Sequence, residues 1–220
     1  MTNKEAIRPM RWILVLGAAL AIPVMGLAQP LTALDVTGKL EFHLKRTVGP
    51  LALVGDAAYA GILQEADTPT EWGQGGSGYG KRFASTVACS GIHSALAFGL
   101  DSTLHEDPRY FRSVRAGFWR RTAHAFRETI LTHTDQGAET LSIWRFGSAY
   151  GAAYLSNQWY PGRLNTVKLG FAEGSLQVGF DLASNLASEF WPDLKRKILS
   201  GKLRLALRAA PKTVEHETRY

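Results

Sequence analysis

The sequence predicts an all-α protein, a helical bundle of about five helices that pack through faces of glycine, alanine and serine. Three observations support this fold class. No segment alternates apolar and polar residues over a length sufficient for a sheet. Glycine, proline and clustered polar residues separate apolar segments of helical length. Small residues recur four apart inside these segments, as at Gly147 and Gly151, which allows helix backbones to approach closely.

The first half of the chain predicts three helical segments and one long loop. Residues 29–46 form an entry segment with a short amphipathic helix, and residues 47–65 form an apolar helix rich in alanine and glycine. Residues 66–80 contain one proline and five glycines, which makes them the clearest loop. A long helix over residues 81–104 then ends before Pro108, because the residue before a proline avoids the α region.

The second half predicts three more helical segments within the same domain. They cover residues 115–132, 139–158 and 163–190, with a turn at residues 134–137 and a stop at Trp191-Pro192. A basic stretch over residues 193–208 extends as a short helix. Residues 29–210 are therefore expected to form one helical domain, and residues 211–220 a flexible C-terminal tail.

The N-terminus has the three parts of a secretory signal peptide. A basic region precedes an apolar run, Trp12–Met25, and small residues lead to a cleavage site after Ala28. The alternative is an uncleaved membrane anchor, but this run of 14 residues is shorter than the roughly 20 that a membrane span needs. Residues 1–28 thus predict export, to the periplasm or the outer membrane of a bacterium.

Charge and cysteine content exclude some classes of function. Removal of residues 1–28, which hold three basic residues and one acidic residue, lowers the net charge from +6 to +4. This mild charge does not indicate a nucleic-acid partner, although it is compatible with anionic lipid headgroups. Cys89 is the single cysteine, so no intramolecular disulfide can form. Cys89 is interpreted as a small packing residue, with a reactive thiol or an intermolecular bridge as the alternatives.

Whether the helices lie in a membrane is left open by their composition. Residues 83–100 are uncharged, and this stretch of 18 residues covers roughly 27 Å, just short of the bilayer core of about 30 Å. The later helices carry charges such as Arg145 and Asp181, which are costly near a bilayer centre. The sequence is compatible with three interpretations: a membrane span, a peripheral membrane association and a soluble periplasmic bundle.

The richest polar cluster is His105-Glu106-Asp107-Pro108-Arg109-Tyr110. His105 could act as a general base oriented by Asp107, or the two could supply part of a metal site. His133 and Asp135 are weak candidates for a third group. The simpler interpretation is a helix-terminus network, in which Asp107 caps a helix and Arg109 pairs with a carboxylate. The spacing of these residues matches no standard metal-binding motif, so the sequence predicts neither a metal nor a cofactor.

A segment rich in arginine and aromatic residues follows this cluster. Between residues 108 and 127 there are six arginines, no acidic residue and five aromatic residues. Arginine binds phosphate through paired hydrogen bonds, and aromatic side chains favour the membrane interface. The alternative is a solvated basic face with its aromatic residues packed inward. The candidate residues for binding lipid phosphate or another anion are Arg109, Arg112, Arg115, Arg120 and Arg121.

Four motifs together resemble a family of exported bacterial envelope proteins with no established activity. They are Glu71-Trp72-Gly73-Gln74-Gly75, Gly78-Tyr79-Gly80-Lys81-Arg82-Phe83, the His105–Tyr110 cluster and Glu189-Phe190-Trp191-Pro192. The resemblance spans roughly residues 45–197. It implies a shared envelope fold and brings no catalytic residue or cofactor with it.

The sequence as a whole favours a non-enzymatic, membrane-associated envelope protein with a structural or lipid-contacting role. Membrane lipid or other envelope components are the expected partners, nucleic acid is not, and no oligomeric state is indicated. One alternative is a hydrolase or metal-dependent enzyme centred on His105 and Asp107. The other is a soluble periplasmic protein that binds an apolar ligand in a cavity of roughly 300 Å³ or more between its helices.

Overall fold

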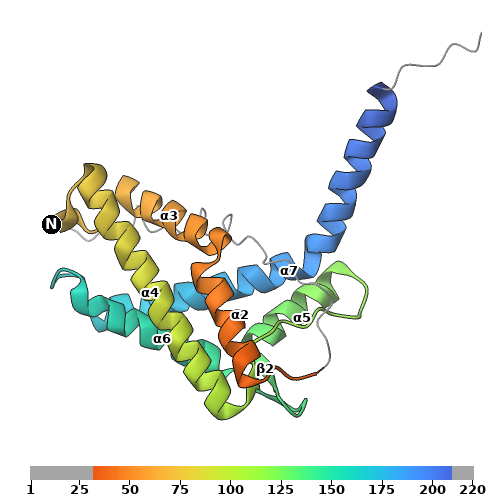
Figure 1. The fold of residues 1–220 in the computed structure, drawn as a ribbon, viewed down its shortest axis with the longest axis horizontal. Coiled ribbons are helices and arrows are strands. Elements are labelled where there is room, and N and C mark those ends of the chain that lie inside the picture. The colour runs from red at the N-terminus through yellow and green to blue at the C-terminus, as the bar shows by residue number, and fades with distance from the viewer. Residues whose placement is uncertain (1–31, 210–220) are drawn as a thin grey trace, which may run out of the picture. The chain divides into compact units, whose positions relative to one another are not determined.

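The computed structural model describes residues 32–209 (Figure 1). These residues contain six α-helices and one small sheet of three strands, which confirms the predicted all-α helical bundle. The predicted signal peptide and the predicted tail, residues 1–28 and 211–220, lie outside the described residues. The described chain divides into two compact units, residues 32–189 and residues 190–209.

The elements follow one another with short connections. The helices are α2 (Val36–Val48), α3 (Pro50–Glu65), α4 (Gly75–Leu104), α5 (Phe118–Ile130), α6 (Ile143–Ser156) and α7 (Val167–Ala209). The strands are β1 (Glu106–Asp107), β2 (Leu131–Thr134) and β3 (Glu139–Leu141), and β2 lies between β1 and β3 with antiparallel pairing on both sides. Two 3₁₀ turns, Thr70–Trp72 and Asn157–Trp159, precede α4 and follow α6.

Helix α4 is the centre of the first unit, because α2, α3 and α6 all pack against it (Figure 1). Glycines make the closest of these contacts. A Cβ atom at Gly147 or Gly151 of α6 would lie 2.7 or 2.9 Å from a methyl group of a leucine on α4. A Cβ atom at Gly174 of α7 would lie 2.3 Å from the ring of Tyr150 on α6. The glycines that recur four apart therefore mark close helix packing, as their spacing predicts.

The polar and apolar faces of α2 are inverted relative to a helix on the surface of a soluble protein. One stripe along α2 is apolar and outward, and its members are 41–61% exposed: Val36, Leu40, Leu44 and Val48. The opposite stripe, Lys39, His43 and Thr47, is polar and at most 8% exposed. In soluble proteins the apolar stripe of an amphipathic helix faces the core, so the interior of this bundle is polar.

The same inversion extends through the described residues. Twenty polar or charged residues are buried there, against eight apolar ones, of which six are alanines. Large apolar side chains are exposed instead on α2, α3, α5, α6 and α7. Arginine, lysine, aspartate and glutamate are almost never fully buried in soluble proteins unless they are paired. The first unit is therefore held together by polar contacts and close backbone approach more than by an aliphatic core.

The three-stranded sheet differs from the prediction that no sheet forms. Residues 131–132 and 139–141, the predicted ends of two helices, instead belong to β2 and β3, so α5 ends at Ile130 and α6 begins at Ile143. The strands have two to four residues, too few to create a recognisable alternation. The predicted turn at residues 134–137 is present, and it joins two strands instead of two helices, with Gly137 at φ 86°.

Three other predicted boundaries are wrong. Helix α4 starts at Gly75, inside the expected loop over residues 66–80, because only two of the five glycines there, Gly73 and Gly75, have a positive φ. Helix α7 continues through Pro192 instead of stopping there, since a proline removes one backbone hydrogen bond without necessarily ending a helix. Also, Gly49 with an extended ψ separates α2 from α3, so the helix predicted over residues 47–65 begins at Pro50.

Arg82 holds the connection between α3 and α4. Its guanidinium is fully buried and donates to the carbonyl oxygens of Thr68, Pro69 and Gly73 at 2.7–2.8 Å. It also donates to the side chain of Gln64 at 2.6 Å. The guanidinium of Arg82 therefore ties the glycine-rich segment to the first turns of α4. The carbonyl groups of this segment accept the hydrogen bonds that the guanidinium donates.

We expect substitution at Gly174 to test the close packing of α6 and α7. Gly174→Val would push against the Tyr150 ring and lower the free energy of unfolding by about 1–3 kcal/mol, the usual effect of overpacking. Gly179→Ala on the same helix is the matched control, because no atom lies within 4 Å of its Cβ position. It should raise the stability by about 1 kcal/mol. Denaturant unfolding followed by circular dichroism measures both, and equal stability of the two variants would contradict the proposed contact.

Candidate functional site

A buried ionic network connects α2 to α4 and to the β2–β3 turn. The Lys39 ammonium donates to the backbone carbonyl of Asp101 at 3.1 Å and to the carboxylate of Asp135 at 2.9 Å. The His43 imidazole Nε2 lies 2.6 Å from Asp101 Oδ2. Each buried charge thus has a partner of opposite charge, which is the condition under which ionic groups are tolerated in a protein interior. The network is structural and leaves no group in it poised to react.

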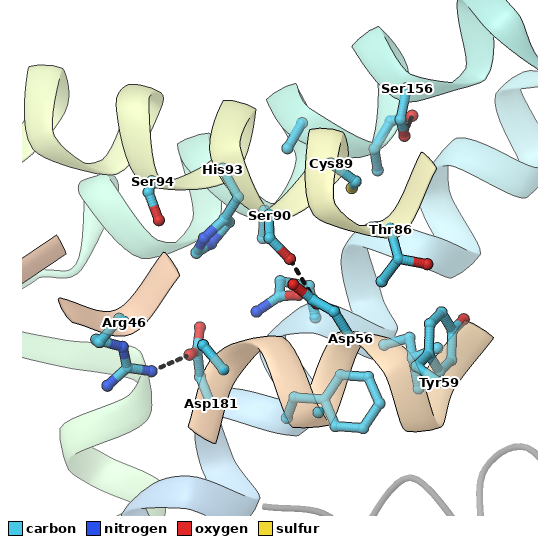
Figure 2. Close-up of a pocket in the computed structure, with 18 of the residues that line it drawn as sticks. Arg46, Asp56, Tyr59, Thr86, Cys89, Ser90, His93, Ser94, Ser156 and Asp181 are labelled. Atoms are coloured by element: carbon cyan, nitrogen blue, oxygen red, sulfur yellow. Dashed lines mark hydrogen bonds and ion pairs between the residues drawn. The ribbon is translucent and has the colours of Figure 1, made fainter. Parts of the chain in front are cut away.

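A cavity of about 340 Å³ lies between the helices of the first unit (Figure 2). Side chains from α2, α3, α4, α6 and α7 line it, and many of them are polar. Arg46 lies 3.5 Å from Asp181, and Ser90 donates to Asp56 at 2.9 Å across the space between α3 and α4. The free thiol of Cys89 also faces this cavity. The lining is therefore mixed, with ionic, hydroxyl and aromatic groups.

Several polar atoms at this cavity have no hydrogen-bond partner. Asp56 Oδ2 and Asp181 Oδ2 are buried without one, as is Arg145 Nε, which lies 3.9 Å from Asp181 Oδ2. Burial raises the pKa of Glu173, which also lines the cavity, to about 7. Carboxylates that lack donors can accept hydrogen bonds from a small molecule with hydroxyl or amino groups. The chemistry that the cavity offers is the recognition of a polar solute.

The candidate residues of the His105–Tyr110 cluster are separated by their pairing. Asp107 accepts hydrogen bonds from Arg109 Nε at 2.9 Å and Nη2 at 2.5 Å, and both side chains are buried. His105 is exposed at the end of α4, and its Nδ1 lies 3.6 Å from Asp135 Oδ2. The structure therefore places His105 beside Asp135, and Asp107 pairs with Arg109 instead of with His105. Arg109 thus binds a carboxylate, as the helix-terminus network predicts. The predicted capping role of Asp107 is wrong, because Asp107 lies on β1 and the next helix, α5, begins at Phe118 with Gly117 at its N-cap.

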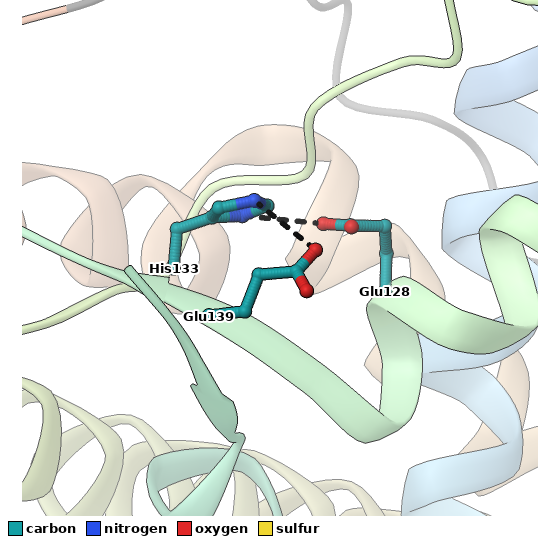
Figure 3. A group of neighbouring side chains, drawn as sticks. All are labelled: Glu128, His133 and Glu139. Atoms are coloured by element: carbon teal, nitrogen blue, oxygen red, sulfur yellow. Dashed lines mark ion pairs between the residues drawn. The ribbon is translucent and has the colours of Figure 1, made fainter. Parts of the chain in front are cut away.

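His133 has two other carboxylates beside it (Figure 3). Its Nδ1 lies 3.6 Å from Glu128 Oε2, and its Nε2 lies 3.9 Å from Glu139 Oε1. Burial raises the pKa of Glu128, whereas the hydrogen bond from Arg127 lowers that of Glu139. Asp135, the other weak candidate, binds Lys39 instead. Among the described residues, the Glu128–His133–Glu139 cluster is the group whose donor atoms suit a metal ion.

The five candidate arginines fall into two groups. Arg109 is paired with Asp107, and Arg121 donates to Glu189 Oε1 at 2.8 Å. Glu189 also accepts from the Tyr110 hydroxyl at 2.6 Å, and its pKa is lowered although burial opposes this. The remaining three are exposed around the start of α5: Arg112, Arg115 and Arg120. Only these three present their guanidinium groups to an anion outside the protein.

The sequence reasoning missed the Glu128–His133–Glu139 cluster for a definable reason. His133 and Glu139 are cross-strand partners in the pairing of β2 with β3, so they share one face of the sheet. The expected helix over residues 139–158 hid this relation. The turn signal at residues 134–137, which lies between His133 and Glu139, could have indicated it.

Comparisons of the chain with protein-family models, with curated proteins and with solved structures find no match.

The pKa of Glu173 predicts a pH-dependent stability. The unfolded chain loses this proton near pH 4.5, whereas the folded chain keeps it to about pH 7. Folding therefore binds a proton in this window, and the stability that Glu173 contributes falls as the pH rises from about 4.5 to 7. We expect Glu173→Gln to reduce this fall, as measured by thermal unfolding at a series of pH values. Glu65→Gln, at an exposed glutamate of α3, is the control, and an unchanged pH profile for Glu173→Gln would refute the assignment.

Proposed function

We propose that this protein is an exported helical protein of the bacterial cell envelope that associates with a membrane and has a structural or lipid-contacting role. The observation that carries the proposal is the inverted distribution of side chains, with charged residues inside and large apolar residues outside. The predicted signal peptide and the resemblance to exported envelope proteins support the compartment.

The free energy of transfer of the outward apolar side chains from water favours an apolar environment around the protein. Removal of a leucine or valine side chain from water contributes about 1.5–3 kcal/mol when burial is complete. The stripe of Val36, Leu40, Leu44 and Val48 on α2 alone offers four such side chains. Charged residues inside membrane proteins face the bundle interior and pair with one another, and Lys39, His43 and Asp101 do so here.

Helix α4 adds a second, weaker line of support. Among the described residues it is the one helix that is long and apolar enough to cross a membrane, judged by length and composition. The core helix of a soluble protein passes the same test, but such a helix is mostly buried. Here only 11% of the most apolar window of α4 is buried. The rest of residues 83–100 is half-buried, or exposed at positions such as Ala84, Ala88 and Ala95, which is compatible with lipid contact.

The start of α5 has the composition of a membrane interface. Phe118 and Trp119 are 60% and 79% exposed, and the exposed Arg112, Arg115 and Arg120 lie beside them in the chain. Aromatic side chains concentrate at headgroup level, where guanidinium groups can bind lipid phosphate. The segment of residues 112–120 is therefore the part of the surface that we assign to lipid headgroups.

A second candidate function is the binding of a small molecule in the cavity between the helices. Its volume of about 340 Å³ meets the size that a ligand site requires. The oxygens of Asp56 and Asp181 that accept no hydrogen bond favour a polar ligand over the apolar ligand that the sequence suggested. The enzyme hypothesis centred on His105 and Asp107 gains no comparable support, because Arg109 occupies the Asp107 carboxylate.

Membrane association predicts the behaviour of the protein during fractionation of the envelope. The protein should stay with the membranes through a high-salt wash and leave them only with detergent. Replacement of the outward leucines by Leu40→Gln/Leu44→Gln should then weaken flotation with phospholipid vesicles at least about tenfold, given the transfer energy of two leucines. Glu41→Gln/Lys45→Gln, at an exposed ion pair of the same helix, is the control. Recovery of the wild type in the soluble fraction at low salt would refute the proposal.

The arginines beside Trp119 predict a preference for anionic lipid. The variant Arg112→Gln/Arg115→Gln/Arg120→Gln should bind vesicles that contain 30% phosphatidylglycerol about 100-fold more weakly, at about 1 kcal/mol per arginine. Its binding to vesicles of phosphatidylcholine alone should change little. Lys45→Gln/Lys81→Gln/Lys168→Gln removes the same charge elsewhere and serves as the control. Equal losses in the two triple variants would indicate attraction by net charge alone.

A further inference from the structure

The geometry points to a site for a divalent transition-metal ion, Zn²⁺ in the first instance, formed by Glu128, His133 and Glu139. This inference is independent of membrane association. The three residues come from three elements: Glu128 lies in the last turn of α5, His133 on β2 and Glu139 on β3. One donor atom from each residue lies within 4.8 Å of the other two.

The local fold explains why these three side chains meet. His133 is the register partner of Glu139 in the antiparallel pair, so their side chains share one face of the hairpin. Strand β2 follows α5 directly, with the helix ending at Ile130 and the strand beginning at Leu131, which places Glu128 five residues before His133. The hairpin therefore brings the imidazole and one carboxylate to the end of the helix that carries the other carboxylate (Figure 3).

The contacts inside the cluster are too long for an ordinary hydrogen-bonded ion pair. The Glu128 side chain is only 4% exposed, yet among the described residues its carboxylate accepts no hydrogen bond, and its nearest partner is His133 Nδ1 at 3.6 Å. His133 Nδ1 is itself buried without a hydrogen-bond partner. Buried polar groups are nearly always satisfied. A buried imidazole nitrogen without a hydrogen-bond partner, 3.6 Å from a carboxylate oxygen, fits a metal ion bound between the two groups.

The spacing and the donor types select the ion. Zinc binds imidazole nitrogen at about 2.0–2.1 Å and carboxylate oxygen at about 2.0–2.2 Å, so two of its ligand atoms in a tetrahedral site are about 3.4 Å apart. The separations here, 3.6 Å from Glu128 to His133 Nδ1 and 3.9 Å from Glu139 to His133 Nε2, are slightly wider, so the side chains draw together when an ion binds. Glu128 faces Nδ1 and Glu139 faces Nε2, yet one nitrogen of the ring and one oxygen of each carboxylate all lie within 4.8 Å of one another, so these three atoms can converge on one ion. Imidazole with carboxylate suits Zn²⁺, Mn²⁺ or Fe²⁺ better than Mg²⁺, which prefers oxygen ligands and water.

Neighbouring groups define how the site is enclosed. Phe111 packs edge-on against the His133 ring with centroids 5.6 Å apart, which restricts the orientation of the ring. Arg127 donates a hydrogen bond to Glu139 Oε2, whereas Oε1 of the same carboxylate faces His133. Arg127 can therefore orient the Glu139 carboxylate as a metal ligand. Glu139 and part of His133 are exposed, which gives an ion a path from solvent. With three protein ligands, a fourth position remains for water or another ligand.

Zinc titration of the purified full-length mature chain tests this assignment. After treatment with EDTA and its removal, isothermal titration with ZnCl₂ should show one Zn²⁺ per chain, and MgCl₂ should not bind at the same concentration. His133→Gln and Glu139→Gln should each raise the dissociation constant by about 100-fold. His105→Gln removes an exposed histidine outside the cluster and should bind like the wild type.

The variants remain informative if one of them fails to fold. Glu139 is exposed, so Glu139→Gln tests the site even where a change at His133 destabilises the hairpin, and circular dichroism of each variant without metal checks the fold. Co²⁺ in place of Zn²⁺ should give visible absorption bands in the wild type that Glu139→Gln lacks. No zinc binding by the wild type, or equal binding by the wild type and both cluster variants, would overturn the assignment.

Discussion

The bundle depends on the pairing of charges in its interior. Lys39, His43 and Asp101 connect α2 to α4, Asp107 is held by Arg109, and Arg145 donates to the carbonyl oxygens of Glu128 and Thr129 at 2.8–3.0 Å. Loss of one member of a buried pair leaves an uncompensated charge and costs about 3–5 kcal/mol. The helices therefore have few alternative arrangements, because each must keep its polar partners in reach. Fixed donors and acceptors determine which helices are neighbours. An aliphatic core, by contrast, would allow the helices to slide along one another.

A polar interior also explains the small residues and the apolar surface. Charged groups on adjacent helices meet only if the backbones lie close together, and Gly147, Gly151 and Gly174 permit this approach. The large apolar side chains then have no interior left to fill and point outward. The cavity, the exposed Trp119 segment and the Glu128–His133–Glu139 cluster all lie within this one arrangement. The packing of the fold and its proposed lipid contact are two results of the same constraint.

The sequence predicts the helical class and the close helix packing well, because glycines four apart have a direct geometric meaning. It also contains both stripes of α2, Val36–Leu40–Leu44–Val48 and Lys39–His43–Thr47. Periodicity cannot tell which stripe faces inward, since an amphipathic helix has the same pattern in water and in lipid with its faces exchanged. The short strands could not be predicted, because two to four residues create no period. The Asp107–Arg109 pair was available from spacing alone, whereas the Glu128–His133–Glu139 cluster required the hairpin.

The anchoring of the α3–α4 connection by Arg82 has a consequence for the order of assembly. The acceptors of its guanidinium lie 9 to 18 residues earlier in the chain, so this corner closes as soon as the first turns of α4 have emerged. The bridge from Lys39 to Asp135 joins residues 96 apart and must wait for most of the chain. A polypeptide that is threaded through a translocation pore from its N-terminus would thus form a helical hairpin first and close its ionic interior last. Until that closure the unpaired charges keep the chain hydrated, and the apolar exterior is completed only when the whole bundle has arrived.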